Sequence, residues 1–277
     1  MADKEDALIR HSHVATRHVV LMPRDLKALE QLYLHRAITS GQLARLCYSD
    51  ISYETSRKRL RRLNQSGVIG SANSGRMEGR GRPELIYFLS GAGAKAVQEF
   101  KDVPAEAIPT GPPHTYHKEH FLRLVDIRLS LIQAIDKRLI DELEWFTGRE
   151  SWSDKIALLS QLSEHADALI NFRYPQGPML SVLLEIDTGN FRQTRHWEPK
   201  MRDFLRAGLP IWVVSGSVQR IHTLRKWTQP LLDEYGFGPG KCVFAVFDEL
   251  MNQGVFSATW YRTDGSVTDL RPRGLAT

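Results

Sequence analysis

One basic stretch decides the fold of the N-terminal part of the chain: Ser52-Tyr53-Glu54-Thr55-Ser56-Arg57-Lys58-Arg59-Leu60-Arg61-Arg62-Leu63. At about 100° per residue, Ser56, Leu60 and Leu63 share one face of a helix, and basic side chains occupy the opposite face and the flanks. An apolar stripe anchors such a helix, while the donors opposite it reach phosphates and base edges. The stretch therefore predicts a helix, capped by Ser52, that contacts nucleic acid. Its candidate DNA-binding residues are Tyr53, Thr55, Arg57, Lys58, Arg59, Arg61 and Arg62.

Further predicted elements surround this helix. Apolar residues at helical spacing indicate a helix over 24–34, and Thr39 or Ser40 caps a second, shorter helix. Gly67 ends the basic helix, because glycine tolerates a positive φ. The elements that follow are two β-prone stretches at 68–71 and 85–89 and a fourth helix over 90–100.

A loop rich in glycine and arginine, 74–83, joins the two β-prone stretches. Its glycines allow the tip of a hairpin to approach another backbone closely. Arg76, Arg80 and Arg82 can then reach phosphates or a narrow minor groove. These three arginines complete the candidate DNA-binding set.

The order helix, helix, basic helix, basic hairpin resembles that of winged helix-turn-helix proteins. The resemblance is carried by Gln42-Leu43-Ala44, Arg59-Leu60-Arg61-Arg62-Leu63, Gly67-Val68-Ile69 and Gly81-Arg82-Pro83-Glu84-Leu85-Ile86-Tyr87. It implies that the partner is double-stranded DNA. A homodimer is also expected, because winged-helix proteins often pair to read two half-sites.

Charge is distributed unevenly along the chain. Residues 1–101 hold 17 Lys and Arg against 10 Asp and Glu, a net charge of +7, whereas residues 102–277 hold 20 against 22, a net charge of −2. Between Ile51 and Pro83 there are eight basic residues and two acidic ones. A local excess of positive charge favours a polyanionic partner through counterion release. DNA capture is therefore expected in the N-terminal domain.

Composition is that of a globular protein with room for two domains, because 42% of the 277 residues are hydrophobic and 25% are charged. The two cysteines, Cys47 and Cys242, suggest neither a disulfide framework nor a zinc site. Without a membrane-length apolar run or a signal-like N-terminus, the protein is expected to be cytoplasmic and to have no membrane partner. The expected organisation is a flexible segment at 1–22, the winged helix-turn-helix at 23–100, a proline-rich linker at 101–113 and a second domain at 114–277.

The second domain is predicted to be mixed α/β. It opens with a long helix over 114–139 and continues with hairpin-linked strands and a strand–helix–strand unit. The predicted strands cover 143–147, 167–174, 181–187, 210–214, 242–247 and 256–262, and the predicted helices cover 191–207 and 217–235.

Three acidic residues stand in apolar surroundings within the predicted hairpin: Asp167, Glu185 and Asp187. Glu185 and Asp187 are two apart on a strand, so they project to one face. Depending on loop length, Asp167 falls opposite Glu185, Ile186 or Asp187, and the first and last of these registers place all three carboxylates on one face. Clustered carboxylate oxygens suit Mg²⁺ or Mn²⁺, and Lys200 follows on the next helix within expected reach.

This arrangement resembles the PD-(D/E)XK fold, or restriction-endonuclease-like fold, in which an Asp and an acidic residue two before a Lys hold a metal and position the attacking water. The resemblance implies that Asp167, Glu185 and Asp187 are metal ligands and, with Lys200, candidate catalytic residues. It also implies that Glu119, on the long helix, is the upstream catalytic acid. The sequence departs from the pattern because Asp187 stands where the fold has its lysine. Cleavage therefore does not follow from the resemblance, and enzyme activity stays open.

The whole layout resembles the plasmid replication-relaxation family from about Pro23 to Ser215. The resemblance rests on the winged helix, the linker, a long helix opening with His117 and His120, and the strands Ala166-Asp167-Ala168-Leu169-Ile170 and Leu184-Glu185-Ile186-Asp187-Thr188-Gly189. It implies a DNA-binding accessory or regulatory protein of plasmid or mobile-element replication and relaxation. Two alternatives stay open: a Mg²⁺-dependent nuclease that nicks DNA at sites chosen by the winged helix, and a dimeric transcriptional repressor.

Overall fold

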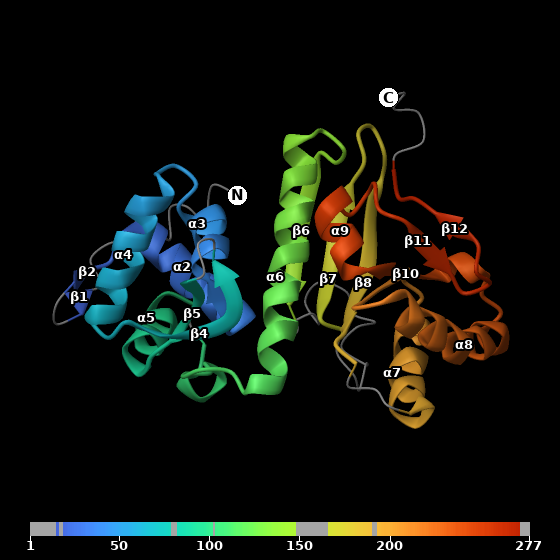
Figure 1. Ribbon diagram of the computed structural model, residues 1–277, viewed down its shortest axis with the longest axis horizontal. Coiled ribbons are helices and arrows are strands. Elements are labelled where there is room, and N and C mark those ends of the chain that lie inside the picture. Colours follow the sequence, from blue (N-terminus) through green and yellow to red (C-terminus); the bar gives the residue numbers. More distant parts are fainter. Residues whose placement is uncertain are drawn as a thin grey trace. The chain divides into compact units, whose positions relative to one another are not determined.

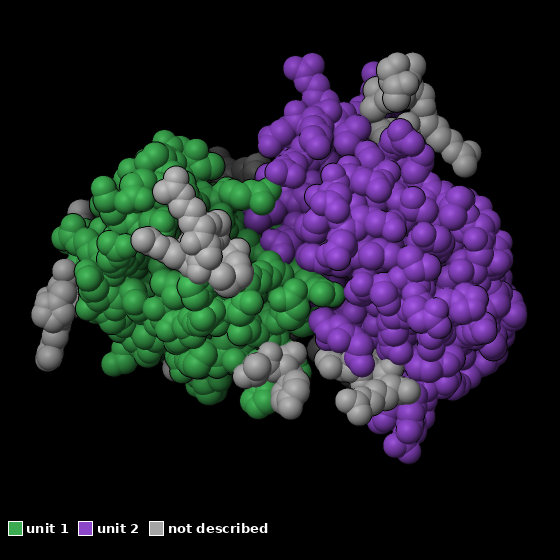
Figure 2. Space-filling model, in the orientation of Figure 1, with its two compact units in different colours: residues 1–125 green, residues 126–277 purple. Residues whose placement is uncertain are grey.

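The computed structural model describes residues 15–16, 19–78, 82–101, 103–147, 166–189 and 193–271. The chain divides into two compact units, Met1–Val125 and Asp126–Thr277, coloured green and purple in Figure 2. Each unit combines helices with a β-sheet, so the chain is mixed α+β. The division falls inside helix α6 (Thr115–Asp136), and the segment 101–113, expected to be a linker, belongs to the first unit. No helix in the described ranges has the length and hydropathy of a membrane span.

The first unit combines helices with a three-stranded antiparallel sheet in the order β3-β5-β4 (Figure 1). Its sheet and helices are β3 (Ile38–Thr39), β4 (Ile69–Glu78), β5 (Arg82–Leu89), α2 (Pro23–His35), α3 (Ser40–Cys47), α4 (Tyr53–Gln65) and α5 (Gly91–Lys101), followed by a 3-10 turn at Ala105–Ala107. A separate pair of short strands, β1 (Ala15–Thr16) and β2 (Val19–Val20), precedes them. Val19 and Leu21 are buried, so the first unit begins before the predicted start at 23.

The caps of α3 and α4 confirm the helix starts predicted from the sequence. The Thr39 hydroxyl accepts a hydrogen bond from the Gln42 N–H (3.2 Å), and the Gln42 side chain accepts one from the Thr39 N–H (2.9 Å). Thr39, rather than Ser40, is therefore the cap, because this reciprocal pairing satisfies two backbone donors. Ser52 caps α4 with a single backbone hydrogen bond, its hydroxyl accepting from the Thr55 N–H at 3.2 Å. The predicted apolar stripe of α4 is also confirmed: its buried residues are Ser56, Leu60 and Leu63.

The β4–β5 hairpin is longer than the sequence predicted. Pairing continues past Asn73↔Leu85 to Met77↔Pro83 and Glu78↔Arg82, after a register shift between Asn73 and Met77. Gly75 lies in that irregularity with a φ of +84°, a conformation that glycine adopts without strain. Much of the stretch expected to be a loop is thus strand, because a local bulge allows the ladder to resume.

The second unit is built on a seven-stranded mixed sheet in the order β12-β11-β10-β9-β8-β7-β6. Neighbours β8, β9 and β10 are parallel, and the remaining pairs are antiparallel. The elements are β6 (Glu142–Thr147), β7 (Ala168–Arg173), β8 (Met179–Asp187), α7 (Thr194–Arg206), β9 (Ile211–Ser215), α8 (Val218–Tyr235), β10 (Cys242–Val246), α9 (Phe247–Gln253), β11 (Trp260–Arg262) and β12 (Val267–Thr268), with a 3-10 turn at Pro239–Lys241.

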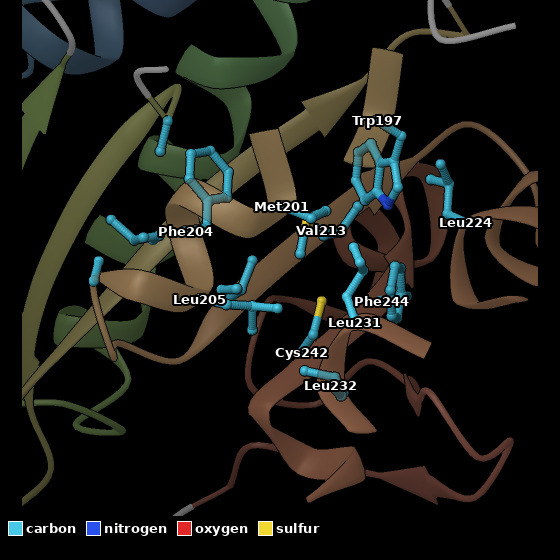
Figure 3. Close-up of a cluster of buried hydrophobic side chains, with 14 of the residues drawn as sticks. Trp197, Met201, Phe204, Leu205, Val213, Leu224, Leu231, Leu232, Cys242 and Phe244 are labelled. Carbon is cyan, nitrogen blue, oxygen red and sulfur yellow. The ribbon is translucent and has the colours of Figure 1, made fainter. Parts of the chain in front are cut away.

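A buried apolar cluster joins α7 and α8 to one face of this sheet. Figure 3 shows members of this cluster from each element, among them Trp197 and Phe204 of α7, Val213 of β9, Leu224 of α8 and Phe244 of β10. Side chains alternate between the two faces of a strand. The face of β8 that meets this cluster therefore carries Leu183 and, further along, the two predicted carboxylates.

Candidate functional site

The outer face of α4 carries five of the ten candidate DNA-binding residues. Tyr53, Thr55, Lys58, Arg61 and Arg62 are all exposed. Within this set, Lys58 lies 3.8 Å from the Glu54 carboxylate, and the Thr55 hydroxyl shares a hydrogen bond with that of Ser52 (2.9 Å). An exposed ion pair at this spacing contributes little to stability, so Lys58 can exchange its partner for a phosphate at low cost.

Arg59 differs from its neighbours because it points into the first unit. Its Nε donates to both oxygens of Asp25 (3.0 and 3.1 Å), and its Nη2 donates to the Val20 carbonyl (2.8 Å). Asp25 is fully buried and also accepts from the Met22 N–H (2.7 Å) and the Tyr48 hydroxyl (3.0 Å). The hydrogen bond with Asp25 raises the pKa of Arg59, and burial, reinforced by Asp25, raises that of Tyr48. Arg59, expected from the sequence to contact DNA, is here the partner of a buried carboxylate.

Arg76 on the hairpin is engaged by the start of α6. Its guanidinium meets the Glu119 carboxylate at 3.0 and 3.3 Å, and Arg123 reaches the same carboxylate at 3.0 Å. Burial alone would raise the pKa of Glu119, but hydrogen bonds from both arginines outweigh it and lower that pKa. Glu119, the expected upstream acid, thus belongs to the first unit and is bound there by two cations. Arg80 and the side chain of Arg82 lie outside the described residues.

A groove of about 360 Å³ lies between α4 and the β4–β5 hairpin. It is lined by Ser40, Arg57, Arg61, Asn64, Asn73, Pro83, Leu85 and Tyr87, and none of these side chains is acidic. The sequence prediction included its two arginines and missed the rest. One available signal was the spacing of Arg57, Arg61 and Asn64, since residues at i, i+4 and i+7 share a helix face.

In the second unit, Glu185 and Asp187, two of the three predicted carboxylates, lie two residues apart on β8. Each is buried and forms an ion pair. Glu185 meets the Lys200 ammonium of α7 at 2.7 Å. Asp187 is bound by Arg220 of α8 through two hydrogen bonds (2.8 and 3.0 Å) and also accepts from the Ser215 hydroxyl (2.9 Å). The predicted reach of Lys200 to this cluster is therefore observed, whereas Arg220 was missed.

Asp167 immediately precedes β7, and its carboxylate accepts a hydrogen bond from the backbone of β8. The last ladder pair is Ala168↔Leu184, so the next position of this register sets Asp167 against Glu185. This is one of the two registers expected to align all three carboxylates. Asp167 leaves the ladder, however, and its Oδ2 accepts from the Ile186 N–H at 2.7 Å.

These residues do not fit the predicted Mg²⁺ or Mn²⁺ site. Within the part of the chain that the structure describes, no three His, Cys, Asp or Glu side chains are grouped to hold a metal ion. A hard cation needs several free carboxylate oxygens. Here Lys200 and Arg220 supply positive charge at Glu185 and Asp187 instead. The physical cause is the Glu185-Ile186-Asp187 sequence, which places two buried carboxylates on one face of β8, each with its own need for a cation.

The family model described as replication-relaxation matches residues 29–206. The chain belongs to the replication-relaxation family. The segment shared with the family runs from within α2 to the end of α7, so it holds α4, the groove, Glu185, Asp187 and Lys200. Arg220 lies beyond it. No curated protein and no solved structure matches this replication-relaxation protein.

Proposed function

We propose that the protein binds double-stranded DNA through a winged helix-turn-helix and serves plasmid or mobile-element replication as an accessory or regulatory protein. In this proposal α3 and α4 are the helix-turn-helix, α4 enters the major groove, and the β4–β5 hairpin is the wing. The second unit, whose mixed sheet we interpret as restriction-endonuclease-like, is a scaffold. Membership of the replication-relaxation family supports the process.

The exposed basic face of α4 is the observation that carries the proposal. Lys58, Arg61 and Arg62 project from the helix on the side away from its buried stripe. Glu54 is the one acidic residue of the helix. Neutralising phosphates with such a face releases condensed counterions, and this release drives binding to DNA.

The ion pairs of the second unit favour a scaffold over a nuclease. Glu185 and Asp187 are each 2% exposed or less. Withdrawing a cation from a buried carboxylate is costly, because the charge left behind has lost its compensation. A metal ion would have to displace Arg220 or Lys200 before it could use these oxygens. The described geometry therefore supports binding without cutting.

The proposal is tested by measuring duplex affinity against salt concentration by fluorescence anisotropy. Replacing Lys58 and Arg62 with alanine should make the fall of log K with log salt less steep by about 1.8, because each phosphate contact contributes about −0.9 to the slope. The matched control replaces Lys137 and Lys226, two exposed cations of the second unit, with alanine and leaves the slope unchanged. Wild-type protein that does not bind duplex, or equal losses in both variants, would contradict the proposal.

A further inference from the structure

We propose that the groove between α4 and the β4–β5 hairpin binds one sugar–phosphate unit of a DNA strand. This inference rests on the proposed function and deepens it, because it names the flank of α4 along which a strand passes. The side of α4 that lines the groove carries Arg57, Arg61 and Asn64. It differs from the outermost face of the helix, which carries Lys58 and Arg62. The strand would therefore be held between the helix and the hairpin rather than against the helix alone.

Two arginines form the cationic wall of the groove. Arg57 and Arg61 are four residues apart, so one turn of α4 sets them above one another. The guanidinium of Arg57 lies 5.7 Å from the centre of the Tyr53 ring, which supports its position. Arg61 is exposed and forms no ion pair with any residue in the described ranges. Paired guanidinium groups match the geometry of phosphate oxygens.

The opposite wall is apolar and comes from β5. Leu85 is 41% exposed although it lies in a strand, and Pro83 stands two positions before it on the same side. Isolated exposed leucines are ordinary, but this one borders a groove with cations on its far wall. A deoxyribose has an apolar face and carries its charge on the adjoining phosphate. Leu85 and Pro83 would therefore contact the sugar while Arg57 and Arg61 hold the phosphate.

Two amides add to the polar lining, which also includes Ser40 and Tyr87, and each amide is fixed by a hydrogen bond. The Asn64 amide nitrogen donates to the Ser71 hydroxyl at 3.0 Å. The Asn73 side-chain oxygen accepts from the Gly75 N–H at 2.8 Å, which occupies the acceptor end of the amide and fixes its orientation. A pre-positioned donor suits a phosphate or sugar oxygen, because little conformational freedom is lost on binding.

The size and charge of the groove indicate a nucleotide unit. Its volume of about 360 Å³ is at the lower end of ordinary ligand sites, which span roughly 300–1,000 Å³. The lining carries two positive charges and no negative one. An acidic peptide could satisfy the arginines, but the proposal commits to DNA because Arg61 also borders the exposed basic face of α4.

Thiol protection tests occupancy of the groove directly. Leu85→Cys places a reactive thiol on its apolar wall, and the natural cysteines Cys47 and Cys242 are buried and contribute little background. With DNA at about ten times Kd, about nine-tenths of the protein is bound and maleimide labelling should fall about tenfold. Met179→Cys is the matched control, since Met179 is 42% exposed in the second unit, and its labelling should not change. Unchanged labelling of Leu85→Cys by saturating DNA would overturn the proposal.

Charge variants in the Leu85→Cys protein separate the groove from the outer face. At DNA concentrations that saturate each variant, Arg57→Gln with Arg61→Gln should abolish protection, whereas Lys58→Gln with Arg62→Gln, which removes equal charge and also weakens binding, should preserve protection once DNA is bound. Protection retained in the first variant would contradict the inference. Duplex and single strand of one sequence are tested separately: protection by either supports the proposal and identifies the source of the sugar–phosphate unit, and protection by neither overturns it. Anisotropy on the same samples reports whether DNA binding itself, and so the proposed function, has failed.

Discussion

Replacing Arg59 with methionine separates a structural role from a DNA-binding one. Methionine keeps the apolar stem and removes the guanidinium, which leaves the buried Asp25 carboxylate with only the Met22 N–H and the Tyr48 hydroxyl as donors in its described surroundings. Breaking a buried ion pair typically costs 3–5 kcal/mol. Because the Arg59 side chain is 18% exposed, we expect the lower end, about 3 kcal/mol.

Thermal unfolding followed by circular dichroism measures this loss. A destabilisation of about 3 kcal/mol in a unit of this size lowers Tm by on the order of 10 °C. Adding Asp25→Asn to Arg59→Met should recover much of the loss, because the second change removes the uncompensated charge and keeps an acceptor for Met22 and Tyr48. Arg61→Met, on the exposed face of the same helix, should change the unfolding free energy by less than about 0.5 kcal/mol.

For DNA binding, the two substitutions should rank the other way: Arg61→Met should have an effect and Arg59→Met should not. Below the unfolding transition, Arg59→Met should leave the salt dependence of duplex binding unchanged, whereas Arg61→Met should make its slope less steep by about 0.9. The reasoning is refuted if Arg59→Met costs less than about 1 kcal/mol while reducing the slope as Arg61→Met does. That result would mean that Arg59 contacts phosphate and that Asp25 does not depend on it.

Two further predictions concern packing and chemistry. Gly93→Ala should destabilise the first unit by about 2 kcal/mol in chemical denaturation, because a Cβ there would lie 2.3 Å from the Val68 carbonyl oxygen. The control, Gly91→Ala, places its Cβ where no atom lies within 4 Å and should be neutral or slightly stabilising. Equal effects of the two substitutions would argue against close packing at Gly93. Supercoiled plasmid incubated with Mg²⁺ or Mn²⁺ should stay intact on agarose gels, and nicking that disappears in Glu185→Ala would show that the second unit is a nuclease.

Local signals in the sequence predicted α4 well. Its cap at Ser52, its stripe of Leu60 and Leu63 and its end near Gly67 depend on residues within a few turns of one another. Such features follow from helical periodicity and from backbone donors that need a nearby acceptor. Helices α7 and α8 and most strands of the second unit were predicted for the same reason.

The role of Arg59 could not be predicted because its partner is distant in the sequence. Asp25 lies 34 residues away, and the helix periodicity placed Arg59 only on a flank, where either solvent or a neighbouring helix could meet it. The same holds for Asp187, whose partner Arg220 is 33 residues away. Ion pairing across elements depends on packing, which no local pattern encodes.

Helix α9 and the β4–β5 hairpin were mispredicted for a different reason. The residues of α9, Phe247–Gln253, follow directly on the apolar strand β10 and are too few to show a helical period. The hairpin was predicted as a glycine-rich loop because the bulge at Gly75 interrupts strand alternation. Short elements and irregular ladders carry weak periodic signals.

The ion pair between Asp187 and Arg220 crosses the boundary of the family segment. Asp187 lies within residues 29–206, and the arginine that neutralises it lies downstream. A substitution at Arg220 alone would not change the sequence of the family segment, but it would leave the buried Asp187 carboxylate in its sheet without a compensating cation. The stability of the shared segment therefore depends on a residue outside it: a variant that loses Arg220 should regain its stability only when Asp187 is also removed or another cation takes the place of the arginine.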